Sequence, residues 1–324
     1  MNLCFWEQYD TMSTKGSDLR MIEFKRHKLT DKPEYERTLF SQPERGCEYS
    51  FANQYLWGRQ QMAWIQGCAV FFAHFYGRSV YPYPVGDGDK KAALDAILRD
   101  AGKRGIPCRI TGMTEADKEE LERLFPDKFT VKTDRDGFDY VYAIDDLADL
   151  KGRKFQKKRN HVNRFRANHP DYEVVPLTVC NMAMAQHMVN EWYRIRMKED
   201  PEGDYLLENI ALARAFQNYE ALGLEGIMLM DQGKVLAVTM GTKLREDTFD
   251  IHFEKALEDV DGAYPVVNCE FARYLRLKYP EVQYLNREDD MGLEGLRKAK
   301  LSYNPHHMVE KYWAYVTEEI HENC

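Results

Sequence analysis

A polar loop at residues 286–290, read NREDD, carries side chains suited to binding or catalysis. The apolar residues before it predict a strand over 282–287, and the leucine spacing after it predicts a helix over 291–302. In open α/β sheets, ligands bind beyond the carboxyl ends of the strands. We therefore expect Asn286, Glu288 and Asp289 to contact a substrate.

The predicted helix places Arg297 four residues from a leucine on either side, in line with its apolar face. A half-buried guanidinium needs a carboxylate or phosphate partner, because an unpaired buried charge is costly. Arg297 therefore either binds a ligand or forms an ion pair within the protein. Lys298 lies on the outer face, where it can also pair with Glu294. With Lys300, these cations complete the expected substrate-binding set.

Residues 248–255 are predicted to form a strand with two unlike faces. Apolar and polar side chains alternate along it, in the order Phe249, Asp250, Ile251, His252, Phe253 and Glu254. A central strand is usually apolar on both faces, so we expect the polar face to meet a ligand. His252 or Glu254 is then suited to accept a proton from an attacking group. The alternative is a solvent-exposed sheet face without a chemical role.

The segment at residues 151–166, KGRKFQKKRNHVNRFR, concentrates positive charge, with eight Lys or Arg and no acid. Helical spacing gives it a narrow apolar stripe of Phe155, Val162 and Phe165. Basic side chains surround this stripe: Lys154, Lys157, Lys158, Arg159 and Arg164. Such a helix suits the phosphates of tRNA, a lipid head group or coenzyme A. The alternative is a solvated connector whose bases pair with acids elsewhere.

Length and charge narrow the class of protein. A chain of 324 residues is long enough for two domains. Its net charge of -8 excludes a protein that coats nucleic acid or anionic membrane with its whole surface. No apolar run approaches the roughly 18 residues of a membrane helix, and the first residues lack a signal-peptide pattern. We expect a cytoplasmic protein.

The cysteines and histidines predict no metal site, and we also expect no tightly bound cofactor. Seven cysteines are scattered singly, without a close pair, which indicates reduced thiols rather than disulfides or zinc ligands. Adjacent His306 and His307 are expected on opposite faces of a strand, where they cannot readily bind one ion.

The two halves of the chain show the same order of elements. In each half we predict strand, strand, strand, helix, strand, helix, strand, displaced by roughly 165–175 residues. In the second half these elements include strands at 226–230, 235–242 and 308–316, and a helix ended by Pro280. We therefore divide the chain into an extension at 1–20, a domain at 21–150, a basic connecting segment at 151–176 and a second domain at 177–324.

This order resembles the fold of the Gcn5-related N-acetyltransferases, an α/β fold with mixed sheets, in each half. The whole chain resembles bacterial proteins related to the C-terminal domain of phosphatidylglycerol lysyltransferase, which are tandem copies of this fold shared with Fem-type aminoacyltransferases. The segments that carry the resemblance are 152–165 (GRKFQKKRNHVNRF), 252–257 (HFEKAL) and 286–305 (NREDDMGLEGLRKAKLSYNP). The resemblance implies aminoacyl-tRNA as donor, with an amine or hydroxyl acceptor on a small molecule or lipid head group.

With such a donor, we assign roles to the residues named above as hypotheses. Arg297, Lys298 and Lys300 would hold a phosphate or the donor carbonyl, and Asn286 with Asp289 the donor's amino group. An acyl-coenzyme A donor is the first alternative. Residues 257–268, LEDVDGAYPVVN, lack the glycine-rich turn that holds a pyrophosphate, and their acids would repel it. The weak Gly86-Asp87-Gly88 turn does not replace it. The second alternative is a binding protein that kept the fold and lost catalysis.

Overall fold

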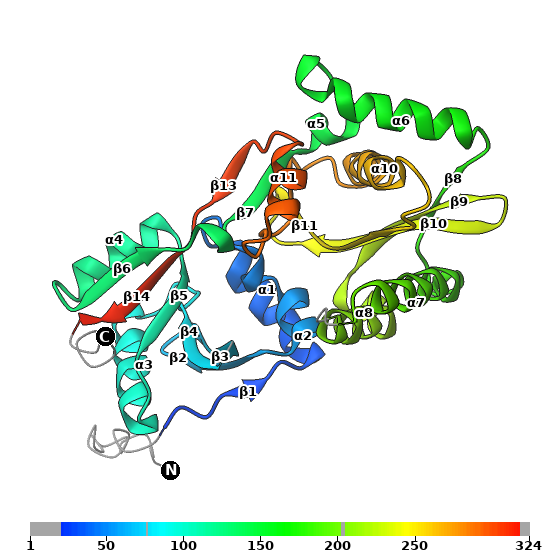
Figure 1. Cartoon of the computed structure of the whole chain (residues 1–324). Coiled ribbons are helices and arrows are strands. Elements are labelled where there is room, and N and C mark those ends of the chain that lie inside the picture. The colour runs from blue at the N-terminus through cyan, green and yellow to red at the C-terminus, as the bar shows by residue number, and fades with distance from the viewer. Residues whose placement is uncertain (1–20, 76, 202–204, 318–324) are drawn as a thin grey trace, which may run out of the picture.

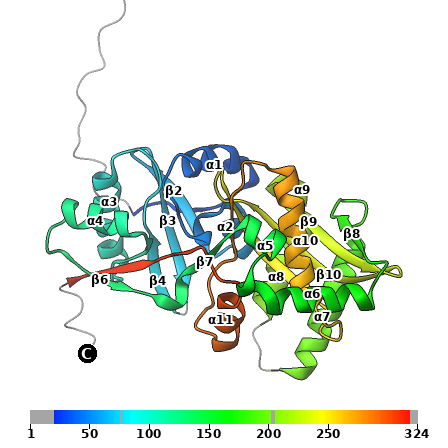
Figure 2. The same cartoon turned by 90° about the horizontal axis from the view of Figure 1, so that it is seen from above.

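Two seven-stranded sheets lie side by side and organise the chain (Figures 1 and 2). The computed structural model describes residues 21–75, 77–201 and 205–317. The predicted extension at residues 1–20 lies outside these residues. The tandem arrangement of two mixed α/β units expected from the order of elements is confirmed.

The first sheet contains one parallel pair, β4 with β5, and all of its other neighbours are antiparallel. Its strands, in spatial order, are β1 (Lys25–Arg26), β2 (Gln60–Ile65), β3 (Cys68–Phe75), β4 (Arg78–Pro82), β5 (Arg109–Met113), β14 (Tyr312–Val316) and β6 (Phe129–Thr133).

The second sheet repeats this plan, with β11 and β12 as its parallel pair. Its strands, in spatial order, are β8 (Glu173–Pro176), β9 (Glu225–Asp231), β10 (Lys234–Lys243), β11 (Thr248–Ala256), β12 (Tyr284–Asn286), β7 (Asp139–Ala143) and β13 (His307–Val309).

The two halves exchange their last strands. β7 belongs to the first half of the chain but pairs with β12 and β13, whereas β14 comes from the C-terminal end and pairs with β5 and β6. The expected single strand at 308–316 is therefore wrong: it consists of β13 and β14, which join different sheets. The predicted domains therefore divide the chain by residue number, but each sheet includes one strand from the other half of the chain.

The helices cover the faces of the sheets. They are α1 (Lys32–Phe40), α2 (Phe51–Trp57), α3 (Lys90–Arg104), α4 (Glu115–Leu124), α5 (Ile144–Asp149), α6 (Gln156–Asn168), α7 (Met182–Glu199), α8 (Leu206–Gln217), α9 (Tyr219–Leu222), α10 (Ala263–Lys278) and α11 (Glu294–Leu301). Short 3₁₀ turns lie at Leu29–Asp31, Cys47–Tyr49, Arg135–Gly137 and Arg153–Phe155. In the second half, α10 lies on one face of the sheet, below α5 and α6, and α7 and α8 lie on the other (Figure 1).

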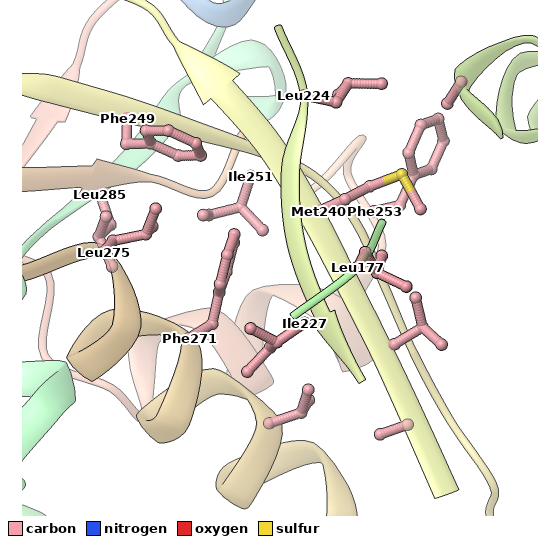
Figure 3. Close-up of a cluster of buried hydrophobic side chains, with 14 of the residues drawn as sticks. Leu177, Leu224, Ile227, Met240, Phe249, Ile251, Phe253, Phe271, Leu275 and Leu285 are labelled. Carbon is pink, nitrogen blue, oxygen red and sulfur yellow. The ribbon is translucent and has the colours of Figure 1, made fainter. Parts of the chain in front are cut away.

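Local sequence signals account for the helix ends. Thr114 and Asp117 form the capping box predicted for α4, because each side chain accepts from the other residue's backbone N–H. Lys278 ends α10 two residues before Pro280, which cannot continue a helix. In the middle of the second sheet, Phe249, Ile251 and Leu285 pack against α10 (Figure 3). This core holds β11 and β12 in place.

The cysteines of the described residues are free thiols: Cys47, Cys68, Cys108, Cys180 and Cys269. This agrees with the expected absence of a disulfide framework, while Cys4 and Cys324 lie outside the described residues. No described helix is both long and apolar enough to cross a membrane.

We expect His27 to make the first half sensitive to acid. Its ring is 9% exposed, lies beside Tyr35, Phe51 and Phe71, and neither nitrogen has a hydrogen-bond partner among the described residues. Burial lowers its pKa from 6.5 to about 4. The unfolded chain therefore binds a proton between these pH values when the folded chain does not, so stability falls as the pH falls through this window.

We expect His27→Leu to remove this loss of stability on acidification, which is at most about 3 kcal/mol between pH 7 and 4. Urea unfolding of parent and variant across that range measures it. His74→Gln, at an exposed position, is the matched control and should retain the parent's slope. An identical pH slope in the parent and His27→Leu would contradict the assignment.

Candidate functional site

The parallel strands β11 and β12 separate partway along their length. Their pairing runs from Thr248 with Tyr284 to Asp250 with Asn286. Beyond that point β11 continues to Ala256, while the chain after β12 turns into the polar loop. We call this point of separation the splay. It is the carboxyl-end position at which a ligand is expected in such sheets.

A β-bulge changes which residues face each side of the splay. Ile251 pairs with Gly241 and Phe253 with Met240, so His252 is an extra residue on β11. Glycine is required opposite it, because a Cβ at Gly241 would collide with the backbone oxygen of Asp250. The bulge reverses the alternation of side chains along the rest of the strand.

The expectation that Asp250, His252 and Glu254 share one polar face is therefore wrong. Phe253 lies against Trp57 of α2, whereas Glu254 contacts Asn268 of α10. His252 stays on the side away from α10, where it contacts Thr242. Two separate polar groups thus flank the splay, one on each side of the sheet.

On the α10 side, Glu254 and Arg287 connect the two separating strands. Arg287 Nη2 donates to Glu254 Oε1 at 2.8 Å, and Asn268 Nδ2 donates to Glu254 Oε2 at 3.3 Å. The guanidinium lies 5.0 Å from the ring centre of Tyr303 and 5.7 Å from that of Tyr142. Arg287 Nη1 and Asn268 Oδ1 have no hydrogen-bond partner among the described residues. This side therefore offers one free donor and one free acceptor.

Lys158 of α6 reaches the same place. Its Nζ lies 3.6 Å from the ring centre of Tyr303. Burial, and secondarily the positive charge of Arg287, lower the pKa of Lys158 to about 8. A lysine with this pKa is partly neutral near physiological pH and can exchange a proton.

The other cations predicted to bind phosphate make different contacts. Lys154 pairs with Asp146 at 2.7 Å, and Arg164 pairs with Asp261 at 2.6 Å. Arg159 donates to backbone carbonyls at the end of α5, and Lys157 is exposed. The apolar stripe predicted for this helix is confirmed: Phe155, Val162 and Phe165 are buried.

On the opposite side of the sheet, His252 lies between buried Thr242 and Asp250 and half-buried Glu288. Its Nε2 is 2.8 Å from Thr242 Oγ1, and its Nδ1 is 3.4 Å from Glu288 Oε1 and 3.5 Å from Asp250 Oδ2. Asn53 Nδ2 also donates to Glu288 Oε1, at 3.1 Å. Burial, reinforced by the charge of Glu288, raises the pKa of Asp250 well above its usual value.

Asn286 lies beneath the loop and is fully buried. Its amide donates to Asp139 of β7 at 2.9 Å, and its side-chain oxygen accepts from the backbone N–H of Glu288 at 2.7 Å. Asp139 also pairs with Lys311 at 2.6 Å. Asn286 thus positions the loop, and these contacts occupy both its side-chain donor and its acceptor.

The loop's other predicted residues are only partly available. Burial raises the pKa of Asp289 to about 7, so that carboxyl group is poised to titrate near neutrality. Lys300 Nζ donates to the backbone carbonyls of Arg287 and Asp289 and fixes the loop against α11. Lys298 is exposed and pairs with Glu294 at 2.6 Å, as helix spacing predicts.

Of the two interpretations of Arg297, the structure shows the ion pair. Its Nε and Nη2 each donate to the carboxylate of Asp290 at 2.8 Å, and Nη2 also donates to Asp136 at 2.6 Å. Arg297 holds the pKa of Asp290 well below its usual range. Asp290 is fully buried, so this bidentate pair stabilises the loop rather than presenting a free guanidinium.

The N-terminus of α10 is covered by α6. A Cβ at Gly262 would lie 2.7 Å from the backbone oxygen of His161 and 3.0 Å from Phe165 Cβ. Asp261, the preceding residue, is paired with Arg164. A pyrophosphate bound at this helix start would therefore meet both the backbone of α6 and an acidic side chain.

Two surface cavities lie elsewhere. One, of about 530 Å³, is lined by residues of β1, β2 and α3, including Trp64. The other, of about 580 Å³, lies between α7 and the turn from β9 to β10, beside Met184. Neither is lined by a residue that the sequence predicts for the site.

Sequence reasoning did not single out Arg287, Asn268 or Thr242, and it gave Asp250 no role of its own. Arg287 lies within the NREDD loop, and its place directly after an apolar strand is a signal of burial that the neighbouring acids obscured. Gly241 in the middle of an apolar strand is a signal for the bulge.

The fold and the splay define a tandem protein of the Gcn5-related acyltransferase fold. Residues 41–315 match the family described as the C-terminal domain of phosphatidylglycerol lysyltransferase, and the chain belongs to this family. The expected family is thereby confirmed.

Several solved structures share the fold. A conserved protein of unknown function from Bacteroides thetaiotaomicron VPI-5482 is 39% identical, with a TM-score of 0.86 over 92% of this chain and 100% of that one. L-PGS from Bacillus licheniformis is 15% identical, with a TM-score of 0.60 over 88% of this chain and 91% of that one. FemX is 12% identical, with a TM-score of 0.56 over 92% and 98%.

One curated protein also matches, an uncharacterized protein of Mycoplasmoides gallisepticum that is 24% identical over 176 residues. The match covers 53% of this chain and 54% of that protein, so the chain spans about half the length of this relative.

Proposed function

We propose that this protein transfers an aminoacyl group from a charged tRNA to an amine or hydroxyl acceptor at the splay between β11 and β12. The observation that carries the proposal is the pair formed by Glu254 and Arg287 across the splay, with Arg287 Nη1 left as a free buried donor. Membership of a lysyltransferase family supports a transferase, and lysyl-tRNA is the first donor to test.

The reaction requires little beyond positioning and charge stabilisation. The acceptor attacks the ester carbonyl, the carbonyl oxygen becomes negatively charged, and the terminal tRNA hydroxyl leaves. Arg287 Nη1 is placed to donate to the developing oxyanion. Glu254 accepts the acceptor's proton, and Lys158, with a pKa of about 8, lies near enough to return a proton to the leaving hydroxyl.

Glu254 is better placed than His252 for proton transfer. Both ring nitrogens of His252 already face Thr242 or carboxylates, and its side chain is only 1% exposed. Glu254 is 12% exposed and lies on the side that Lys158 and Arg287 share. We therefore assign proton removal to Glu254 and treat His252 separately.

The acyl-coenzyme A alternative is disfavoured by the start of α10. That helix end is covered by the backbone of α6 at His161 and flanked by Asp261, so its N–H groups are not open to a pyrophosphate. The tRNA proposal does not use this helix end. It instead places the phosphates of the acceptor strand near the exposed face of α6, which carries Lys157.

A transfer assay tests the proposal. The protein is mixed with tRNA carrying a radiolabelled aminoacyl group, beginning with lysyl-tRNA, and with a panel of amines, hydroxyl compounds and lipid extracts. We expect label to move from tRNA to one acceptor class, and prior ribonuclease treatment to abolish the transfer. Arg287→Ala is expected to lower the rate at least about 100-fold, as loss of an oxyanion donor does.

Acetyl-coenzyme A replaces charged tRNA in the matched reaction. If the acetyl group is transferred from acetyl-coenzyme A and ribonuclease does not affect this transfer, the acyltransferase alternative replaces the proposal. Binding of charged tRNA without transfer to any acceptor, in the parent as well as in Arg287→Ala, would instead favour the binding-protein alternative.

A further inference from the structure

Two acidic clusters lie next to each other beside the splay, and only one of them forms an ion pair with a lysine. In the first, the Lys311 ammonium lies 2.6 Å from both Asp139 and Glu48 and offsets part of their negative charge. In the second, ligand atoms of Asp250, His252 and Glu288 all lie within 4.8 Å of one another. Within the described ranges, no lysine or arginine forms an ion pair with either carboxylate of the second cluster.

Asp250 has no Lys or Arg in direct contact among the described residues, and the charge of Lys311 acts on it only from the neighbouring cluster. The Asp250 side chain is 0% exposed, and neither carboxylate oxygen has a hydrogen-bond partner among the described residues. Buried carboxylates are normally paired or coordinate a metal ion, because removing one from water without compensation is very costly. One of its oxygens lies 3.5 Å from His252 Nδ1, directed into the cluster.

The hydrogen bond of His252 Nε2 determines whether its Nδ1 presents a lone pair to the two carboxylates. Nε2 lies 2.8 Å from Thr242 Oγ1, and that hydroxyl lies 3.5 Å from Ser50 Oγ. When Nε2–H donates to Thr242, the lone pair of Nδ1 faces Glu288 Oε1 at 3.4 Å and Asp250 Oδ2 at 3.5 Å. A metal-bound histidine typically donates its other N–H in this way.

The separations also match a coordination sphere. Zinc binds nitrogen and carboxylate oxygen at about 2.0–2.2 Å, which places neighbouring ligands of a tetrahedron about 3.4 Å apart. The two nitrogen–oxygen distances agree with this value. An imidazole with two carboxylates is a donor set for a divalent metal ion of the first transition series, such as Zn²⁺ or Mn²⁺.

We propose that Asp250, His252 and Glu288 bind one divalent metal ion, with His252 Nδ1 and one oxygen of each carboxylate as ligands. A metal ion fits this place better than the ammonium group of a substrate, because His252 Nδ1 faces two carboxylates at metal-ligand spacing and, of the three side chains, only Glu288, 23% exposed, reaches solvent. Bound there, the ion joins β11 to the loop after β12. This site replaces the expectation that the chain holds no metal, and it does not depend on the proposed transferase activity.

Metal binding by the full-length chain tests the proposal. Protein dialysed against a chelator is given Zn²⁺ or Mn²⁺ and desalted, and retained metal is counted by mass spectrometry. We expect one ion per chain and a thermal unfolding midpoint that rises with metal concentration. Asp250→Asn and Glu288→Gln should abolish retention. Thr242→Val, which leaves all three ligands in place, should weaken binding about 10–100-fold.

Two further measurements distinguish loss of this site from misfolding and from metal binding by surface histidines. Without metal, Asp250→Asn should be at least as stable as the parent, because it removes an uncompensated buried carboxylate, so lost retention cannot be attributed to misfolding. The double variant His306→Gln/His307→Gln should retain the ion. This control is needed because Nδ1 of His306 lies 2.9 Å from Nδ1 of His307, whereas the two rings were expected to face opposite sides of a strand.

Loss of the ion in that double variant, with retention in Asp250→Asn, would assign the metal to the surface histidines and overturn the proposal. A parent that retains neither metal, but is stabilised by free lysine in an Asp250-dependent manner, would show that the cluster binds an ammonium group instead.

Discussion

Replacing Lys311 by methionine is expected to destabilise the protein by about 3–5 kcal/mol, the usual cost of breaking a buried ion pair from one side. Lys311 is 7% exposed and lies between β13 and β14, where the chain crosses from one sheet to the other. Burial alone would lower its pKa, but the carboxylates of Asp139 and Glu48 raise it well above the usual value. Methionine would leave buried Asp139 and half-buried Glu48 without their ion-pair partner.

Equilibrium unfolding in urea measures this effect. Lys298→Met is the matched control, because Lys298 and Glu294 are 74% and 79% exposed and such pairs contribute little. We expect the control to change stability by less than about 0.5 kcal/mol. A loss below about 1 kcal/mol in Lys311→Met would show that Asp139 and Glu48 do not depend on this ammonium.

Glu254→Gln is expected to lower the rate of aminoacyl transfer about 10²–10⁴-fold, the usual contribution of a general base. Glutamine has nearly the same shape and can still accept from Arg287, but it removes the counter-charge of that buried guanidinium, so the rate is compared only where urea unfolding shows that the variant is folded. The loss should appear in kcat and leave KM nearly unchanged. Steady-state transfer rates over a range of charged tRNA concentrations separate the two constants.

Glu258→Gln provides the matched control for this experiment. Glu258 lies four residues further along the chain, is 45% exposed and pairs with Arg196 at the surface. Its substitution should leave both constants within about twofold of the parent, since surface changes have small effects. A decrease of less than threefold in Glu254→Gln would remove Glu254 from the role of base and shift attention to Lys158.

The order of elements could be predicted because it depends on local patterns. Apolar alternation, the Thr114 capping box and the proline after α10 each act within a few residues. The exchange of β7 and β14 could not be predicted in this way. Both are short strands, β7 just after a 3₁₀ turn and β14 two residues after β13, and nothing within either segment specifies which of two similar sheets it joins.

The site was predicted at the level of segments and less well at the level of atoms. The NREDD loop and residues 252–254 do meet at the splay, but one extra residue in β11 turns His252 and Glu254 to opposite sides. Arg297 is half buried, with 31% of its side chain exposed, but through its pair with Asp290 and not through the predicted apolar face, because Leu293 and Leu301 are 55% and 47% exposed. Lys158 reaches the splay from a helix more than ninety residues earlier in the chain, a contact that only the tertiary fold provides.

A crystal structure with an aminoacyl-adenosine analogue, joined by an amide in place of the ester, tests the central claim most directly. We expect the aminoacyl carbonyl between β11 and β12, within hydrogen-bond distance of Arg287 Nη1, and the adenosine directed toward α6. An analogue bound in the cavity beside Met184 or in the one beside Trp64, with the splay still closed by Glu254 and Arg287, would contradict it.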